Sequence, residues 1–252
     1  MNRFYCPSQR LDNPPQAADA AKSDVLSDGH EIPLPTDEAH HALRVLRLRD
    51  GDDVELFDGH GGVARGTLVI RGRAASVRLE RTWREPVLRP TIDVAVALPK
   101  GPRADAMVAA LSQAGVRTMM PLRVERTIVE PRDAKLDRFN RAAVESAKQC
   151  GRAHVMVVST TRSLDEVLAE PHDLRLLTDP RGKSAVDAAA LRAAEHVLIL
   201  IGPEGGWTEA ECDAADRAGC MRWSIGPHVM RVETAAPAAA AIARYLAGPE
   251  AL

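Results

Sequence analysis

Three segments rich in glycine and proline each follow a short apolar run, and they are the part of the sequence best suited to bind a small ligand. They are residues 178–182 (TDPRG), 202–207 (GPEGGW) and 226–235 (GPHVMRVETA). Glycine lets the backbone turn sharply and present its amide and carbonyl groups to a ligand. Ligands of open α/β sheets bind at the carboxyl ends of strands. We therefore expect the three segments to surround one small molecule.

The common motifs for phosphate and metal binding are absent from the sequence. Neither GxGxxG nor GxxxxGK[ST] occurs, which argues against a dinucleotide-dependent oxidoreductase and a phosphate-cradling loop. The histidines show no HExxH spacing and the cysteines no CxxC pair, so no metal is expected. We expect reduced thiols at Cys6, Cys150, Cys212 and Cys220.

The chain after residue 91 alternates short apolar runs with helical patterns. This alternation predicts a mostly parallel sheet with helices on both faces. The expected strands are 92–98, 118–122, 155–159, 174–177, 196–201 and 221–225, and the expected helices are 103–114, 136–149, 164–169, 184–194, 208–218 and 234–246. Thr208 and Glu211 have the spacing of a capping box, which would begin the helix that follows the segment 202–207.

The first 85 residues have a different pattern, in which apolar and polar residues alternate between glycine turns. The runs at 54–57, 63–69 and 75–79 predict antiparallel strands in a small β-barrel. A helix is expected at 37–48, with Leu43 and Leu46 packed on the barrel. Residues 12–30 are expected to form a loop.

Two prolines, Pro86 and Pro90, mark a linker between these patterns. The predicted division is a β domain at 1–85, a linker at 86–91 and an α/β domain at 92–252. Residues 62–84 contain six arginines and one acidic residue, Glu80. Clustered arginine is typical of nucleic-acid binding, but on charge alone an arginine-rich composition with solvated strand faces is the favoured explanation.

The composition is that of an ordinary globular protein, with 45% hydrophobic and 27% charged residues and a net charge of −2. No run approaches the ~18 apolar residues that span a bilayer. The N-terminus lacks the apolar core of a secretion signal, so a cytoplasmic protein is expected.

The strings at 200–211 and 226–235 resemble the two cofactor-loop motifs of the bacterial 16S rRNA uracil-N3 methyltransferases, members of the SPOUT superfamily. The resemblance covers nearly the whole chain, and its specificity comes from the joint order of the motifs. The other matching strings are 3–5, 40–49, 51–52, 56–59, 100–101, 106–108, 115–116 and 145–152. Two positions depart from the family pattern: Val232 stands where threonine is usual, and His228 stands where arginine is frequent.

The resemblance implies an N-terminal PUA-like barrel that binds RNA and a C-terminal α/β domain with a trefoil knot that binds S-adenosylmethionine. It also implies a homodimer with sites near the subunit interface, and methylation of N3 of a specific uridine in 16S rRNA of the small ribosomal subunit. The residues expected to hold the cofactor are Leu177, Thr178, Ile201, Gly202, Pro203, Glu204, Gly205, Gly206, Ile225, Gly226, Val229, Met230, Thr234 and Ala235.

Two charged residues are candidates for the chemistry. Arg231 would stabilise the negative charge that develops on a uracil oxygen, or else cap a helix or contact a phosphate. Glu233 would accept the N3 proton, or else supply favourable charge at the start of the last helix.

Basic residues near the N-terminus are candidates for the RNA contact. His40, Arg44 and Arg47 would share one helix face and, with Arg3, contact the rRNA backbone. Arg152 would bind a phosphate or the uracil, or else be an ordinary surface arginine.

Two further functions stay open at this point. One is a SPOUT methyltransferase that acts on another RNA or another atom. The other is a non-catalytic RNA-binding factor in ribosome assembly, which the intact segments 202–206 and 233–235 disfavour because a pure binder needs no methyl-donor pocket.

Overall fold

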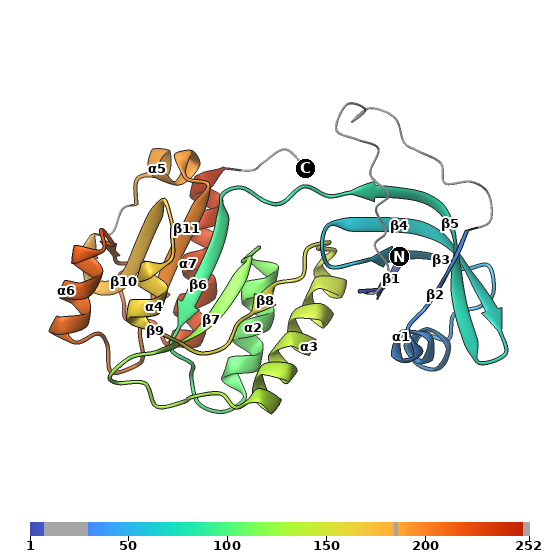
Figure 1. Ribbon diagram of the computed structural model, residues 1–252, viewed down its shortest axis with the longest axis horizontal. Helices are drawn as coiled ribbons and strands as arrows, with labels where there is room; N and C mark the ends of the chain where they lie inside the picture. The colour runs from blue at the N-terminus through green and yellow to red at the C-terminus, as the bar shows by residue number, and fades with distance from the viewer. Residues whose placement is uncertain (8–29, 184–185, 249–252) are drawn as a thin grey trace. The chain divides into compact units, whose positions relative to one another are not determined.

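The computed structural model describes residues 1–7, 30–183 and 186–248 (Figure 1). All but the last residue of the loop expected at 12–30 lies outside these ranges. The chain divides into two compact units, Met1–Val87 with Ala147–Val155, and Leu88–Ser146 with Met156–Leu252. The first boundary lies close to the predicted linker, but the segment 147–155, which the sequence assigns to the second domain, is grouped with the first unit.

A five-stranded sheet forms the first unit. Its strands are β1 (Asn2–Tyr5), β2 (Glu31–Pro33), β3 (Asp53–Phe57), β4 (Gly62–Arg71) and β5 (Ala74–Arg84), in the order β1-β3-β4-β5-β2. β1 pairs in parallel with β3, and the other neighbours are antiparallel. The turn between β4 and β5 uses Gly72 at φ 67°, a conformation that favours glycine.

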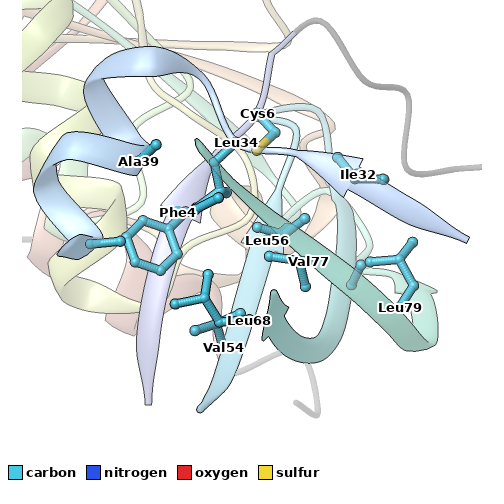
Figure 2. Close-up of a cluster of buried hydrophobic side chains, with 13 residues drawn as sticks. Phe4, Cys6, Ile32, Leu34, Ala39, Val54, Leu56, Leu68, Val77 and Leu79 are labelled. Atoms are coloured by element: carbon cyan, nitrogen blue, oxygen red, sulfur yellow. The ribbon is translucent and has the colours of Figure 1, made fainter. Parts of the chain in front are cut away.

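The core of this unit follows from the alternation of the strands. Val54 and Leu56 on β3 and Val77 and Leu79 on β5 are two residues apart, so each pair points to one side of the sheet. Figure 2 shows them gathered with Phe4 and with the short helix that carries Ala39. A second small core contains Phe57, Val63, Ala147 and Ala153, together with the partly buried Tyr5, Trp83 and Val155. This packing places 147–155 in the first unit.

The helix expected at 37–48 ends three residues earlier than predicted and changes type along its length. α1 spans Thr36–His40, and a π-helical segment, η1, continues over His41–Val45. Arg47 then adopts φ 56°, outside any helix. His40, Arg44 and Arg47 therefore do not share the face of one helix. Leu43 packs on the core as expected, whereas Leu46 is 38% exposed.

The second unit contains a parallel sheet in the order β12-β10-β11-β6-β7-β8, with β9 paired to β7. The strands are β6 (Thr91–Val96), β7 (Thr118–Arg123), β8 (Val157–Val158), β9 (Arg162–Ser163), β10 (Leu174–Lys183), β11 (His196–Ile201) and β12 (Met221–Trp223). The helices are α2 (Arg103–Gln113), α3 (Asp133–Cys150), α4 (Leu164–Ala169), α5 (Ala188–Ala193), α6 (Glu209–Arg217) and α7 (Val232–Ala247). The predicted alternation of strands and helices is confirmed.

Helices cover both faces of this sheet, which explains why its central strands are continuously apolar. Leu198 and Leu200 of β11 pack in a cluster with residues of α4 and α6. Strand alternation directs Val197 and Ile199 to the other face, and α7 lies against β6 and β11 as well as against α2 (Figure 1). None of the helices in the described ranges has the length and hydropathy that a bilayer span requires.

The predicted loop at 178–182 lies inside β10 instead. Trp223 of β12 pairs with both Thr178 and Lys183, so the residues between them form a bulge. Gly182 lies against the backbone of Arg222 and Trp223, where an added Cβ would come within 2.7 Å. The expected strands 92–98, 155–159 and 221–225 and the expected helix 184–194 are shorter in the structure, and residues 184–185 lie outside the described ranges.

A buried ion pair ties the end of α3 to α1 and supplies a test of the first unit. Lys148 Nζ lies 2.9 and 3.0 Å from the two carboxylate oxygens of Glu38, and both side chains are about nine-tenths buried. Lys148→Met should destabilise the protein by about 3 kcal/mol, because it leaves the Glu38 charge buried without its cation. Urea denaturation measures this change.

The double variant Glu38→Gln with Lys148→Met should recover most of that loss, since no uncompensated charge remains. Lys100→Met, at an exposed lysine of the second unit, is the matched control. Equal stability of Lys148→Met and the control would contradict the assignment of this pair as a structural tie.

Candidate active site

The carboxyl ends of three adjacent strands enclose a cavity of about 480 Å³ in the second unit. β12, β10 and β11 are neighbours in the sheet, so the segments that follow or interrupt them meet at one edge. The cavity is lined by Arg126, Thr178, Asp179, Pro180, Arg181, Ile201, Gly202, Pro203, Glu204, Gly205, Gly206, Trp207, Trp223, Ser224, Ile225, Gly226, His228, Val229, Met230, Val232 and Ala235. The structure thus brings together residues of all three glycine- and proline-rich segments.

Most of the residues predicted to hold a cofactor line this cavity. They are Thr178, Ile201, Gly202, Pro203, Glu204, Gly205, Gly206, Ile225, Gly226, Val229, Met230 and Ala235. Two others do not. Leu177 is fully buried in the core beneath the cavity, and Thr234 is exposed on the first turn of α7.

Trp207 connects two walls of the cavity. Its indole Nε1–H donates to the Thr178 carbonyl at 2.8 Å, which joins the loop after β11 to the bulge of β10. The same ring packs on Gly202, where an added Cβ would lie 2.8 Å from the ring. Thr178 in turn donates its hydroxyl to the Leu200 carbonyl at 3.0 Å. Glycine at 202 is therefore required by the close approach of the ring.

Glu211 fixes the loop at its other end. Thr208 and Glu211 form the predicted capping box at the start of α6, with Glu211 Oε2 accepting from the Thr208 N–H at 2.9 Å. Glu211 Oε1 accepts from the Glu125 N–H at 2.8 Å. The turn after β7 is thereby held against the glycine loop, and its next residue, Arg126, donates to the Gly205 carbonyl at 2.6 Å.

Arg126 is a cavity residue that the sequence motifs did not indicate. The turn that carries it, residues 124–127, contains no glycine or proline. The one signal was its position just after a predicted strand, at the same edge of the sheet as the three ligand segments.

A buried carboxylate shapes the wall formed by the β10 bulge. Asp179 is 3% exposed and accepts from the Arg181 backbone N–H at 2.9 Å and from its guanidinium at 3.1–3.2 Å. Burial opposes the ionisation of Asp179, yet the hydrogen bonds from Arg181 hold its pKa below the usual value. The charges of Asp179 and Arg181 therefore neutralise each other within the wall.

The two predicted catalytic residues lie beside the cavity and outside its lining. Arg231 is the exposed residue before α7, and its side chain caps no N–H there. Glu233 Oε1 accepts from Arg103 Nη1 at 3.1 Å. The pKa of Glu233 is lowered by a hydrogen bond from its own backbone N–H and by the hydrogen bond from Arg103, although desolvation opposes this shift. This arrangement fits the alternative role of Glu233 as favourable charge at the start of a helix.

The predicted RNA-contacting residues all lie in the first unit. His40, Arg44 and Arg47 are exposed, and Arg152 is half-buried. Arg3 is 9% exposed, its Nε lies 2.9 Å from Glu55, and its guanidinium stacks 4.7 Å from the Phe57 ring centroid. Arg3 is thus enclosed by its own sheet. The described part of the chain contains no group of three or more metal-ligating side chains.

Comparison with known proteins gives matches for both units. Residues 87–244 match the family model of an RNA methyltransferase domain, and residues 34–80 match that of an RNA methyltransferase PUA domain. The ribosomal RNA small subunit methyltransferase E of Mycobacterium bovis is 33% identical over 229 residues, covering 86% of this chain and 87% of the relative. The protein of the same name from Synechocystis is 32% identical, covering 81% and 69%.

Two solved structures are similar over almost the full length. The ribosomal RNA small subunit methyltransferase E of Neisseria gonorrhoeae, bound to S-adenosyl methionine, has a TM-score of 0.82, 28% identity and 98% coverage of each chain. A Legionella pneumophila protein solved with its cofactor SAM has a TM-score of 0.80, 24% identity and 96% coverage of each chain, a likeness that supports the fold alone.

The bond between Trp207 and Thr178 can be tested directly. Trp207→Phe keeps an aromatic ring on Gly202 but removes the N–H donor, which should loosen the loop against β10. We expect the affinity for S-adenosylmethionine to fall about tenfold, the equivalent of about 1.4 kcal/mol. Isothermal titration calorimetry measures it. Trp83→Phe, in the first unit, is the matched control, and equal affinities of the two variants would show that the bond does not shape the cavity.

Proposed function

Because the chain belongs to the RNA methyltransferase family, we propose that it transfers the methyl group of S-adenosylmethionine to N3 of a uridine in the 16S rRNA of the small ribosomal subunit. The observation that carries this proposal is the cavity at the joined ends of β10, β11 and β12. It lies within the residues that match the methyltransferase domain. The relatives named as small subunit rRNA methyltransferases support the choice of substrate.

The residues of the cavity fit S-adenosylmethionine. A volume of about 480 Å³ lies in the ordinary range for small-molecule sites. Gly202, Gly205 and Gly206 leave the backbone open to polar groups of the ligand, while Ile201, Met230 and their neighbours supply apolar walls. The bound cofactor supplies an electrophilic methyl group on a sulfonium. We include in this proposal that the predicted cofactor-binding residues that line the cavity contact S-adenosylmethionine.

The chain's own contribution to the reaction is alignment and charge. N3 of uracil is a poor nucleophile until its imide proton leaves, so the site must hold N3 in line with the methyl carbon and favour the anionic base. Glu233, engaged by Arg103, is assigned to fixing the start of α7, which carries the cavity residues Val232 and Ala235. Arg231, exposed beside the cavity, is assigned to an RNA phosphate.

The first unit is proposed to bind the rRNA. Its exposed cations include His40, Arg44 and Arg47, with the half-buried Arg152 in the same unit. Arg3 is left out because Glu55 and Phe57 enclose it. Contacts of this kind position RNA through its phosphates and weaken with salt.

Three finer expectations from the resemblance belong to the proposal as well. They are a homodimer with sites near the subunit interface, a trefoil knot in the second unit and a cytoplasmic location. Val229, 80% exposed at the cavity, is an apolar residue that a second subunit would cover. Sedimentation equilibrium of the purified chain tests the dimer.

Mapping of the methylated nucleoside tests the function. Small subunits from a strain that lacks the gene are incubated with the protein and methyl-labelled S-adenosylmethionine, and the nucleosides are identified by mass spectrometry. We expect one 3-methyluridine per small-subunit rRNA. Gly202→Val, whose side chain would overlap the Trp207 ring, should lower transfer at least 100-fold because it displaces the ring that joins two walls of the cavity.

Other results of this experiment would support one of the two alternative functions. Methyl label on another RNA or on another atom would identify a methyltransferase of different specificity. Binding of small subunits with no transfer, and with no affinity for S-adenosylmethionine, would instead support a non-catalytic ribosome-assembly factor.

A further inference from the structure

The wall of the cavity contains few charged groups, and two of them are engaged with each other. Asp179 and Arg181 hold each other through hydrogen bonds. Glu204 and His228 are exposed on the loops after β11 and β12. Arg126 is the remaining cation of the lining, and the ion pairs of the described residues give it no carboxylate partner.

Arg126 is held in place by the turn that carries it. The Val124 N–H donates to Thr127 Oγ1 at 2.8 Å, and the Thr127 N–H donates back to the Val124 carbonyl at 3.0 Å. The Glu125 N–H is bound by Glu211 at 2.8 Å. The backbone on both sides of Arg126 is therefore fixed before any ligand arrives.

The side chain lies directly over the glycine loop. Its Cδ would be 3.2 Å from a Cβ at position 205, so the arginine stem occupies the space that Gly205 leaves open. One guanidinium N–H donates to the Gly205 carbonyl at 2.6 Å. A guanidinium carries five N–H donors in a rigid fork, so a single bond to this loop leaves others for a ligand in the cavity.

We infer that Arg126 contacts the target uracil and stabilises the negative charge on its carbonyl oxygen during methyl transfer. This inference rests on the proposed function. The N3–H bond breaks and its proton passes to solvent. The N3 electron pair forms the bond to the methyl carbon, and the carbon–sulfur bond breaks with its pair remaining on sulfur. The sulfonium charge is lost as the proton is released, and the anion that Arg126 stabilises exists only in between.

Turnover of Arg126 variants tests the role. At saturating S-adenosylmethionine, Arg126→Ala should lower kcat on small subunits about 100-fold, the effect of removing one charge-stabilising donor. Arg126→Lys should regain part of that loss, because it keeps the charge but not the fork. Arg123→Ala, at an exposed arginine of β7 outside the cavity lining, is the matched control and should stay within twofold of wild type.

A pH series separates charge stabilisation from loop support. As pH rises and the uracil ionises unaided, the deficit of Arg126→Ala should narrow, whereas a deficit from a disturbed loop would be the same at every pH. The charged or titratable groups on the elements around Arg126 include Glu204, Glu211, Asp179 and His228, and all four are present in every variant. Calorimetry should give S-adenosylmethionine affinities within threefold of wild type.

Failure of the role of Arg126 can be distinguished from failure of the proposed function. A kcat of Arg126→Ala within threefold of wild type, or a deficit that does not change with pH, overturns the role of Arg126 alone. If the wild-type protein transfers no methyl group to small-subunit rRNA, the proposed function falls and this inference falls with it.

Discussion

The candidate site depends on one hydrogen bond, from the Trp207 indole to the Thr178 carbonyl. Thr178 begins the bulge of β10 and Trp207 ends the loop after β11, so this bond joins two walls that come from different strands. The ring also covers Gly202, and only a residue without a Cβ allows that approach. The Thr178 carbonyl needs a hydrogen-bond partner, and because Trp207 supplies it, this bond sets the distance between the β10 bulge and the loop after β11.

Charges in and around the cavity are arranged so that few of them face a ligand. Asp179 is neutralised by Arg181, and Glu233 by Arg103. Glu211 uses both carboxylate oxygens on backbone N–H groups. The wall is therefore formed mainly by backbone groups and apolar side chains, which suits a cofactor that combines an apolar body with a few polar groups. It also makes the Arg126 guanidinium electrostatically prominent, because none of the ion pairs of the described residues engages it.

The sequence predicted the elements whose signals are local and strong. The run His196–Ile201 is bounded by Glu195 and Gly202 and is apolar on both faces, and its limits were predicted correctly. The edge at which the cavity forms followed from the order of strands and glycine segments. Arg47 was misplaced because nothing in 41–48 indicates the wider π-helical turn before it. Arg126 was missed because its position depends on Glu211, 86 residues away from Glu125. Hydrogen bonds between residues so far apart in the chain produce no periodic pattern in the sequence.

The return of the chain at Ala147–Val155 makes the first unit discontinuous in sequence. Its small core needs Ala147 and Ala153 beside Phe57 and Val63, and the buried Glu38 needs Lys148. A fragment that stopped at residue 87 would lack these partners and would leave aromatic surface and a carboxylate unmatched. The folding of the N-terminal sheet is therefore completed only after the ribosome has synthesised some 60 residues of the other unit. Such an interleaved order couples the maturation of the two units during translation, although each has its own hydrophobic interior.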